Sequence, residues 1–238
     1  MREGDVVEDV LLVLLRRSRG EAGGRLAERR AEDRELLERW LDLELEVGDA
    51  RQGLELAERL ARRYPQDPAL AEKLAFAKFR FRLGVLPERV QELAGRVELE
   101  RGDQALLLFW LFPQVRYGEA GRPRIATDIL DDPRREEIAR VVNLGLMDVD
   151  ESLHRFYPEQ SLERRSLLRS LLRLLAQAEP PADCARDLAP RPSQEAICAA
   201  AERCRLIPSV ADCLPEATVS GREALGYVQR ALELSGSR

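Results

Sequence analysis

The sequence predicts an all-α fold, and three observations support this prediction. Leu, Ala, Arg and Glu, which all favour helices, dominate the 238 residues, whereas aromatic residues make up only 5%. Apolar residues recur at helical spacing in several long stretches. A hydrophobic content of 45% beside 34% charged residues is typical of a soluble globular protein. A chain of this length accommodates one or two domains with cores of their own.

The charge and hydropathy of the chain argue against two classes of partner. Its formal net charge is −5, which repels a phosphate backbone, so we expect no nucleic-acid partner. No stretch reaches the roughly 20 apolar residues that a membrane-spanning helix needs. Lysine occurs only at Lys73 and Lys78, so nearly all the basic charge is guanidinium. That bias reflects either a GC-rich genome and surface ion pairs or the binding of anions.

Residues 34–68 predict two antiparallel helices joined by a tight turn. Leucines and a tryptophan at helical spacing occupy 36–45, and the pair Gly48 and Asp49 then interrupts the helix. A second amphipathic run over 54–61 stops at YPQDP, because proline cannot continue a helix. A helix near 5–19 is expected to cap this array at its N-terminal end.

A second helical unit is expected between residues 68 and 103. Its turn falls around 84–87, and another Gly-Asp pair, Gly102 and Asp103, precedes the apolar stretch QALLLFWLF. The apolar positions of its first helix are Ala71, Leu74, Ala75, Ala77 and Phe79.

The first helix pair resembles a tetratricopeptide repeat, a unit of about 34 residues. Gly48 lies at the family's interhelical turn, and Pro65 is its closing proline. Gly53 and Leu60 occupy the family's small packing positions, Gly53 in place of alanine, and Leu41 replaces another small residue. The resemblance implies that residues 1–118 form a helical-repeat domain whose curved surface binds a protein partner. The alternative is that these hairpins serve only as a spacer.

The second half of the chain repeats one pattern. FYPEQSLERRSLL at 156–168 and CLPEATVSGREAL at 213–225 share a proline, a glutamate and an aliphatic residue at a spacing of 57. An apolar helix precedes each loop, and aligning Ile138 with Ile197 puts Cys204 where Gly145 stops the first helix. The spacing of these helices is then 59, so the second loop is two residues shorter. We predict two helix-loop-helix modules, at 119–178 and 179–238.

The two modules differ at the start of their second helices. Ser220 and Glu223 form the capping-box pattern Ser-x-x-Glu, in which side chains accept the free N–H groups of the first turn. In the first module the same positions hold Glu163 and Ser166, the two residue types exchanged. We therefore predict the better-capped helix in the second module.

These modules resemble S-layer homology modules, which consist of a helix, a loop with Phe-x-Pro and a Thr-Arg-Ala-Glu-type tetrad that opens a second helix. The first copy carries the pattern at Gly145, Phe156, Pro158, Leu162 and Arg164. The second keeps Ser220 and Glu223 but has Gly221 in place of the arginine.

The resemblance implies attachment to the bacterial envelope. Modules of this family usually come as three, arranged quasi-symmetrically, and hold acidic sugar groups of envelope polymers in grooves near the tetrads. An arginine suits that role because a planar guanidinium binds a carboxylate with two hydrogen bonds. The candidate ligands for such a polymer are Arg164, Arg165 and Arg222. The alternative is that these three side chains belong to an ordinary solvated surface.

Four cysteines in the last quarter of the chain predict two disulfide bonds. Cys213 lies in the loop that should fold over the helix carrying Cys198 and Cys204, and Cys184 lies in the proline-rich stretch before that helix. We expect one cross-link from the loop and one from that stretch, with the choice of helix cysteine open. A zinc site, which lacks a Cys-x-x-Cys pair here, and four free thiols are the alternatives.

Disulfides favour an oxidising compartment and hence an extracytoplasmic location, periplasm or cell surface. The early apolar run at 10–15 is too short for the core of a signal peptide. We therefore expect that an export signal was removed or lies outside this sequence. A cytoplasmic location with reduced cysteines is the alternative.

No pattern in the chain supports catalysis, a cofactor or a metal site. The single histidine, His154, has no nucleophile motif beside it, and no Gly-rich phosphate loop occurs. Three functions remain, of which we favour a structural and interaction protein of the bacterial envelope. The others are a cytoplasmic tetratricopeptide-type adaptor and a helix-turn-helix regulator built on REEIARVVNLGLM. The net acidity and the long loop after that stretch argue against the regulator.

Overall fold

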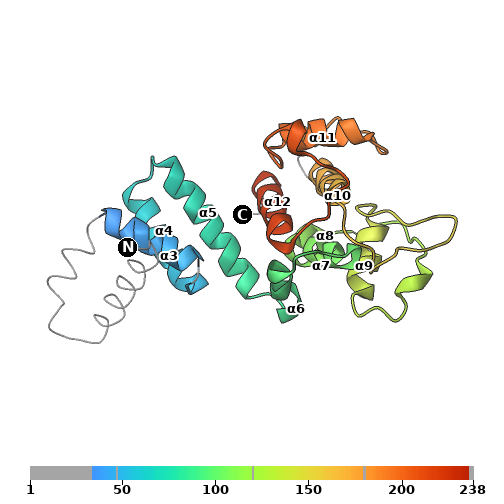
Figure 1. Cartoon of the computed structure of the whole chain (residues 1–238), viewed down its shortest axis with the longest axis horizontal. Coiled ribbons are helices and arrows are strands. Elements are labelled where there is room, and N and C mark those ends of the chain that lie inside the picture. Colours follow the sequence, from blue (N-terminus) through green and yellow to red (C-terminus); the bar gives the residue numbers. More distant parts are fainter. Residues whose placement is uncertain (1–33, 47, 120, 179–180, 236–238) are drawn as a thin grey trace, which may run out of the picture. The chain divides into compact units, whose positions relative to one another are not determined.

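The structure, a computed structural model, describes residues 34–46, 48–119, 121–178 and 181–235. These residues contain ten α-helices and no β-strand, which confirms the all-α prediction (Figure 1). The helix expected near 5–19 lies outside the described residues. The chain divides into two compact units, Met1–Phe81 (unit 1) and Arg82–Arg238 (unit 2). The helices are α3 (Arg34–Glu46), α4 (Ala50–Arg63), α5 (Pro68–Gly84), α6 (Glu88–Gln91), α7 (Arg101–Leu111), α8 (Pro113–Tyr117), α9 (Arg135–Asn143), α10 (Arg164–Gln177), α11 (Gln194–Arg203) and α12 (Gly221–Leu234).

Helices α3, α4 and most of α5 form unit 1 around one apolar core. Asp49 caps α4, since its side chain accepts the N–H groups of Arg51 and Gln52. Helix α4 ends just before Pro65, so the predicted turn and the predicted stop are both confirmed. The buried side chains of the core are Leu37, Leu41, Leu45, Leu56, Ala57, Leu60, Leu70 and Ala77.

The second helical unit does not form a full hairpin. After the turn at 84–87, its second helix is reduced to α6 and a 3₁₀ turn at Glu92–Gly95, and the chain then becomes extended. This extended stretch pairs with segments far along the chain, so residues 82–118 belong to unit 2. The sequence instead predicts domain boundaries after residues 118 and 178. Helical periodicity is a local property and does not show which distant segments pair.

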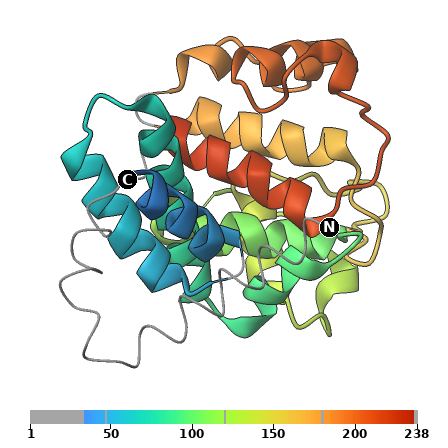
Figure 2. The same cartoon turned by 60° about the vertical axis from the view of Figure 1, so that its left-hand side comes forward.

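Three extended stretches, which we call the first, second and third arms, meet inside unit 2; they cover 96–100, 158–163 and 214–220. One aliphatic residue from each, Leu99, Leu162 and Val219, is fully buried there. Their backbones close a ring of hydrogen bonds. The N–H of Leu162 donates to the carbonyl of Leu99 (2.8 Å), Val219 donates to Leu162 (3.1 Å), and Leu99 donates to Val219 (2.9 Å). Each arm runs into a helix, α7, α10 or α12, and α12 contacts both of the others. Figure 2 shows α10 and α12 side by side, with α11 packed against α10.

The three arms follow one pattern, so unit 2 contains a third copy that the sequence analysis missed. Six residues before each central aliphatic residue lies another buried side chain, Leu93, Phe156 or Cys213. An outer helix packs against each inner one: α9 against α7, α11 against α10, and the 3₁₀ turn after α6 against α12. This additional copy comes first in chain order, around 88–111. It lacks the proline loop, and its outer helix is only about one turn long. Neither of the signals that identified the other two copies is therefore present.

The structure also corrects the alignment of the two outer helices. Gly145 has φ +70°, as its predicted role as a helix stop requires, and the residue in the same left-handed conformation after α11 is Arg205, with φ +54°. The N–H of Leu146 donates to Val141 O, and that of Leu206 donates to Ala201 O. The helices therefore align at a spacing of 60 rather than 59, and Cys204 is the residue before the stop. Glycine favours this left-handed conformation and arginine does not, so the sequence does not mark Arg205 as the counterpart of Gly145. The alignment from sequence is therefore one residue out.

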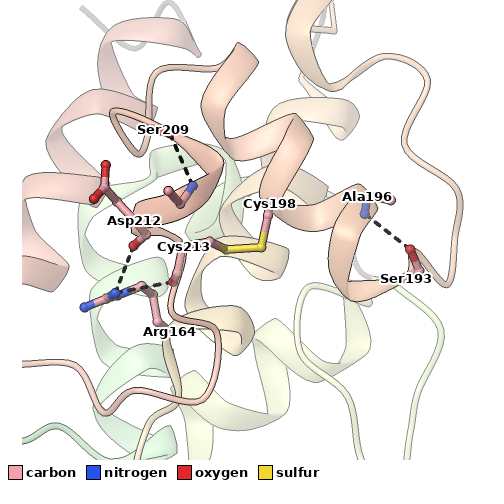
Figure 3. The surroundings of a disulfide bond; sticks show 8 residues. Arg164, Ser193, Ala196, Cys198, Ser209, Asp212 and Cys213 are labelled. Atoms are coloured by element: carbon pink, nitrogen blue, oxygen red, sulfur yellow. Dashed lines mark hydrogen bonds between the residues drawn. A yellow bond between two sulfur atoms is a disulfide. The ribbon is translucent and has the colours of Figure 1, made fainter.

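The cysteines form two disulfide bonds, as predicted. Cys213 in the loop joins Cys198 on α11, with a Cα–Cα distance of 5.7 Å (Figure 3). Cys184 in the proline-rich stretch joins Cys204, with a Cα–Cα distance of 5.1 Å. No described cysteine is free. Cys213 occupies the position of Phe156 in its arm, so a cross-link replaces an aromatic ring at this place in the core.

Removing the loop disulfide should destabilise unit 2. The bond spans 15 residues, a loop for which chain entropy suggests a contribution of about 3 kcal/mol. We expect the double variant Cys198→Ala/Cys213→Ala to lose about 2–4 kcal/mol of unfolding free energy in urea without reductant. The double variant should respond to added reductant less than the parent does, because only the Cys184–Cys204 bond is left to break. Equal stabilities of variant and parent would contradict this prediction.

Candidate functional site

Arg164, a candidate ligand in the sequence, is a structural latch. Its Nη1 donates to the carbonyls of Asp212 (3.1 Å) and Cys213 (3.3 Å), and its Nη2 pairs with Glu223 Oε1 at 2.6 Å (Figure 3 shows the two carbonyl contacts). The side chain is 12% exposed. The guanidinium therefore holds the third arm to the second, and its charge is already paired with Glu223, so Arg164 is poorly placed to bind a ligand.

Arg101 holds the second arm in the same way. Its Nε donates to Phe156 O (3.0 Å) and its Nη2 to Asp148 O (2.9 Å), while its guanidinium lies 4.8 Å from the centre of the Phe156 ring. Arg101 and Arg164 each stand two residues after the central aliphatic residue of their arm. The third equivalent is Gly221, where an added Cβ would lie 1.6 Å from Leu93 O. Only glycine fits there, which explains why this tetrad lacks the arginine.

Arg165 and Arg222 occupy equivalent positions in the second and third arms, but the structure gives them different surroundings. Arg165 pairs with Glu163 at 2.7 Å, and its side chain is 41% exposed at the edge of a cleft. Arg222 is exposed, lies outside that cleft and makes no ion pair with any described residue. Of the three sequence candidates, Arg165 alone lines this cleft.

The cleft has a volume of about 310 Å³ and lies in unit 2 between the start of α10 and the start of α11. Its wall is mostly polar. The lining residues are Arg101, Gln160, Ser161, Glu163, Arg165, Ser166, Arg169, Pro192, Gln194 and Ile197.

Positive charge dominates the cleft. Of its charged lining residues, Arg101, Arg165 and Arg169 are cationic and only Glu163 is anionic. Arg169 contacts Asp148 at 3.2 Å, but that carboxylate is shared with Arg173 at 2.8 Å. Arg101 has no carboxylate within ion-pair distance among the described residues, because its hydrogen bonds go to carbonyls. An anion in this cleft would therefore meet arginines whose positive charge the protein's own carboxylates neutralise only in part.

The pKa directions agree with this charge balance. Burial, and next to it the charge of Arg169, lower the pKa of Arg101. Burial also lowers the pKa of Arg169, opposed by Asp148 and reinforced by Arg173 and Arg165. Arginine stays protonated at neutral pH in proteins, so these shifts mainly express the cost of burying a charged guanidinium, and repulsion between neighbouring arginines adds a smaller part. A bound anion would relieve that repulsion.

Sequence reasoning missed Arg101 and Arg169. Arg101 gives no signal of its own, because the pair Gly102 and Asp103 that follows it predicts a turn in the helical array rather than a tetrad. The spacing of four between Arg165 and Arg169 on α10 was an available signal, since it puts both side chains on one face. Nothing in the sequence indicated that α11 forms the opposite wall.

No described helix is long and apolar enough to cross a membrane, and no cluster of described His, Cys, Asp and Glu side chains is arranged to hold a metal ion. Comparison of the chain with protein-family models, curated proteins and solved structures finds no match.

Proposed function

We propose that this chain is a non-enzymatic structural and interaction protein of the bacterial cell envelope. Unit 2 attaches it to an acidic envelope polymer, and unit 1 binds a protein partner. The observation that carries the proposal is the convergence of Arg101, Arg165 and Arg169 on one polar cleft. The presence of three copies in unit 2 adds support, since the S-layer homology modules that the sequence resembles usually come as three in a quasi-symmetric arrangement.

The chemistry of the cleft favours a carboxylate carried on a sugar. Guanidinium groups bind carboxylates with paired, charge-assisted hydrogen bonds. Arg101 is fixed by its two carbonyl contacts, so little side-chain entropy is lost when it meets a ligand. Gln160, Ser161 and Gln194 supply neutral donors and acceptors suited to hydroxyl groups.

Unit 1 presents the features of a protein-binding surface. Leu36, Trp40 and Phe76 are 39%, 41% and 38% exposed on α3 and α5, although side chains of this size are usually buried. Aromatic side chains are enriched where proteins bind one another. These exposed side chains would suit a protein partner in the envelope and would serve the cytoplasmic adaptor equally well, so the compartment distinguishes the two functions.

A thiol count on protein from its native source decides the compartment. The protein is trapped with alkylating reagent, denatured without reductant and weighed as an intact chain. Four cysteines in disulfides, with no alkylation, support the envelope. Four alkylated thiols would remove that support and favour the adaptor.

Substitution of Arg165 should weaken attachment without unfolding the protein. We expect Arg165→Ala to bind sacculi that retain their acidic polymer about tenfold more weakly or worse, because one charge-assisted contact is worth about 1.5–3 kcal/mol. Its melting temperature should hardly change, since the side chain is partly exposed and its ion pair is a surface pair. Cosedimentation measures the affinity, and sacculi stripped of acidic polymer serve as the blank.

Arg222→Ala is the matched control, because Arg222 holds the same position in the third arm but lies outside the cleft. It should bind as the parent does. Equal losses in both variants would point to nonspecific attraction between arginine and polymer. Failure of the parent to bind either kind of sacculi would overturn the attachment role.

A further inference from the structure

The three inner helices, α7, α10 and α12, begin with equivalent tetrads, each made of the residue before the helix and its first three residues. The sites around these tetrads differ in which groups neutralise their arginines. The third helical residue is Asp103 in α7, Ser166 in α10 and Glu223 in α12. Two of the three tetrads thus end in a carboxylate, and one ends in a neutral hydroxyl. The tetrad with the neutral residue contributes Glu163, Arg165 and Ser166 to the cleft, and the α7 tetrad contributes only Arg101.

At α7 the site is filled by the chain itself. Arg134 stands 60 residues before Gln194, so by the corrected alignment it holds the position of that cleft residue. Its guanidinium pairs with Glu100 (2.8 Å), Asp103 (3.0 Å) and Asp132 (3.0 Å), and an added Cβ on Gly102 would lie 2.3 Å from it. Asp103 also accepts from Arg96 at 2.7 Å.

At α12 the tetrad carboxylate captures the arginine instead. Glu223 Oε1 pairs with Arg164, the equivalent of Arg101, at 2.6 Å and also accepts the Tyr227 hydroxyl at 2.8 Å. The position of Arg169, seven residues after the central aliphatic residue, is held by Gly226 in this helix. This site therefore has one cation fewer, and its remaining buried guanidinium is already paired.

From this asymmetry we infer that each molecule binds one carboxylate-bearing sugar, in the cleft at α10, and that Ser166 keeps the cleft available. The inference rests on the proposed function and assigns it a stoichiometry and a determining residue. A carboxylate at position 166 would reach Arg101 as Glu223 reaches Arg164. It would then act as an internal competitor for the ligand.

The test is calorimetric titration of the full chain with trigalacturonate at pH 7, with the fully methyl-esterified trisaccharide as an uncharged control. We expect one site per chain and no binding of the ester. Ser166→Glu should bind at least tenfold more weakly while melting at or above the parent temperature, because it also supplies an acidic residue to the first turn of α10. Ser166→Ala is the matched control and should bind within about twofold of the parent, because the side chain makes no hydrogen bond to the described residues.

The outcomes separate this inference from the function on which it rests. Two or three sites per chain, or undiminished binding by Ser166→Glu, would overturn the inference and leave envelope attachment intact. Binding to sacculi without binding to trigalacturonate would do the same. If the parent binds neither, both proposals fail.

Discussion

A fragment spanning residues 119–238 is expected to show no cooperative unfolding transition, whereas a fragment spanning residues 82–238 is expected to fold. The shorter fragment contains both modules that the sequence indicates but lacks the arm of Leu99 and all of α7. It loses the hydrogen bonds of Leu162 and Val219 to Leu99. It also loses four buried leucines of α7, Leu106, Leu107, Leu108 and Leu111.

The size of this loss comes from apolar burial. Each buried leucine contributes about 1.5–3 kcal/mol, so the four together approach the 5–15 kcal/mol that typically stabilise a whole domain. Thermal melts followed by circular dichroism, with proton–nitrogen NMR spectra for side-chain order, distinguish the fragments. A sharp melt of the 119–238 fragment would show that two copies suffice and that the ring of arms is dispensable.

Arg134→Ala is expected to lower the free energy of unfolding by about 3–5 kcal/mol. The side chain is 12% exposed and pairs with Asp103 and Asp132, which are 1% and 8% exposed. Its removal leaves the buried carboxylate of Asp132 without its cation and leaves Asp103 with only the partly exposed Arg96. The neighbouring Arg135 is exposed and makes no ion pair with the described residues. Arg135→Ala should therefore lie within about 0.5 kcal/mol of the parent in urea denaturation.

The pH dependence of the unfolding free energy, measured for Arg134→Ala and for the parent, should show whether the lost stability comes from charge. Burial raises the pKa of Asp132, but its hydrogen bonds with Arg134 outweigh burial, so this pKa lies below its ordinary 3.8. A carboxyl with a lowered pKa contributes stability above its unfolded pKa, about 3.9, and that stability is lost as pH falls through the folded value. The variant lacks this contribution, so the gap between variant and parent should narrow below about pH 4. A constant gap from pH 7 to pH 3 would assign the loss to packing instead of charge.

Features set by neighbouring residues could be predicted from the sequence, and features set by distant pairing could not. Asp49, Pro65 and Gly145 act within one turn of the backbone, so the turn, the stop and the left-handed residue are where the sequence puts them. Ser220 accepts the N–H of Glu223 and α10 has no side-chain cap, so the better-capped helix is in the second module, as predicted. Glu223 does not complete the capping box, because its side chain pairs with Arg164 and Tyr227 instead.

Arg164 illustrates the limit. Its sequence position beside a loop suggested a ligand, but its partners Asp212 and Cys213 lie about fifty residues away and only the fold brings them together. The same holds for the first arm, whose role depends on pairing with 158–162 and 219–221 and not on any motif of its own. The cleft is formed by three copies at once, so no single stretch of sequence encodes it.

The ring of arms also constrains how a gene of this kind can change. Stacked helical hairpins leave both ends open, so duplication of one hairpin lengthens the stack. In unit 2 each central residue, Leu99, Leu162 or Val219, donates to one neighbour and accepts from the other, so no unused edge is left for a fourth. Gly221 adds a second constraint, because the third copy fits only against the first. Copies in this unit cannot be gained or exchanged singly, and the lineage can extend it only by duplicating all three together.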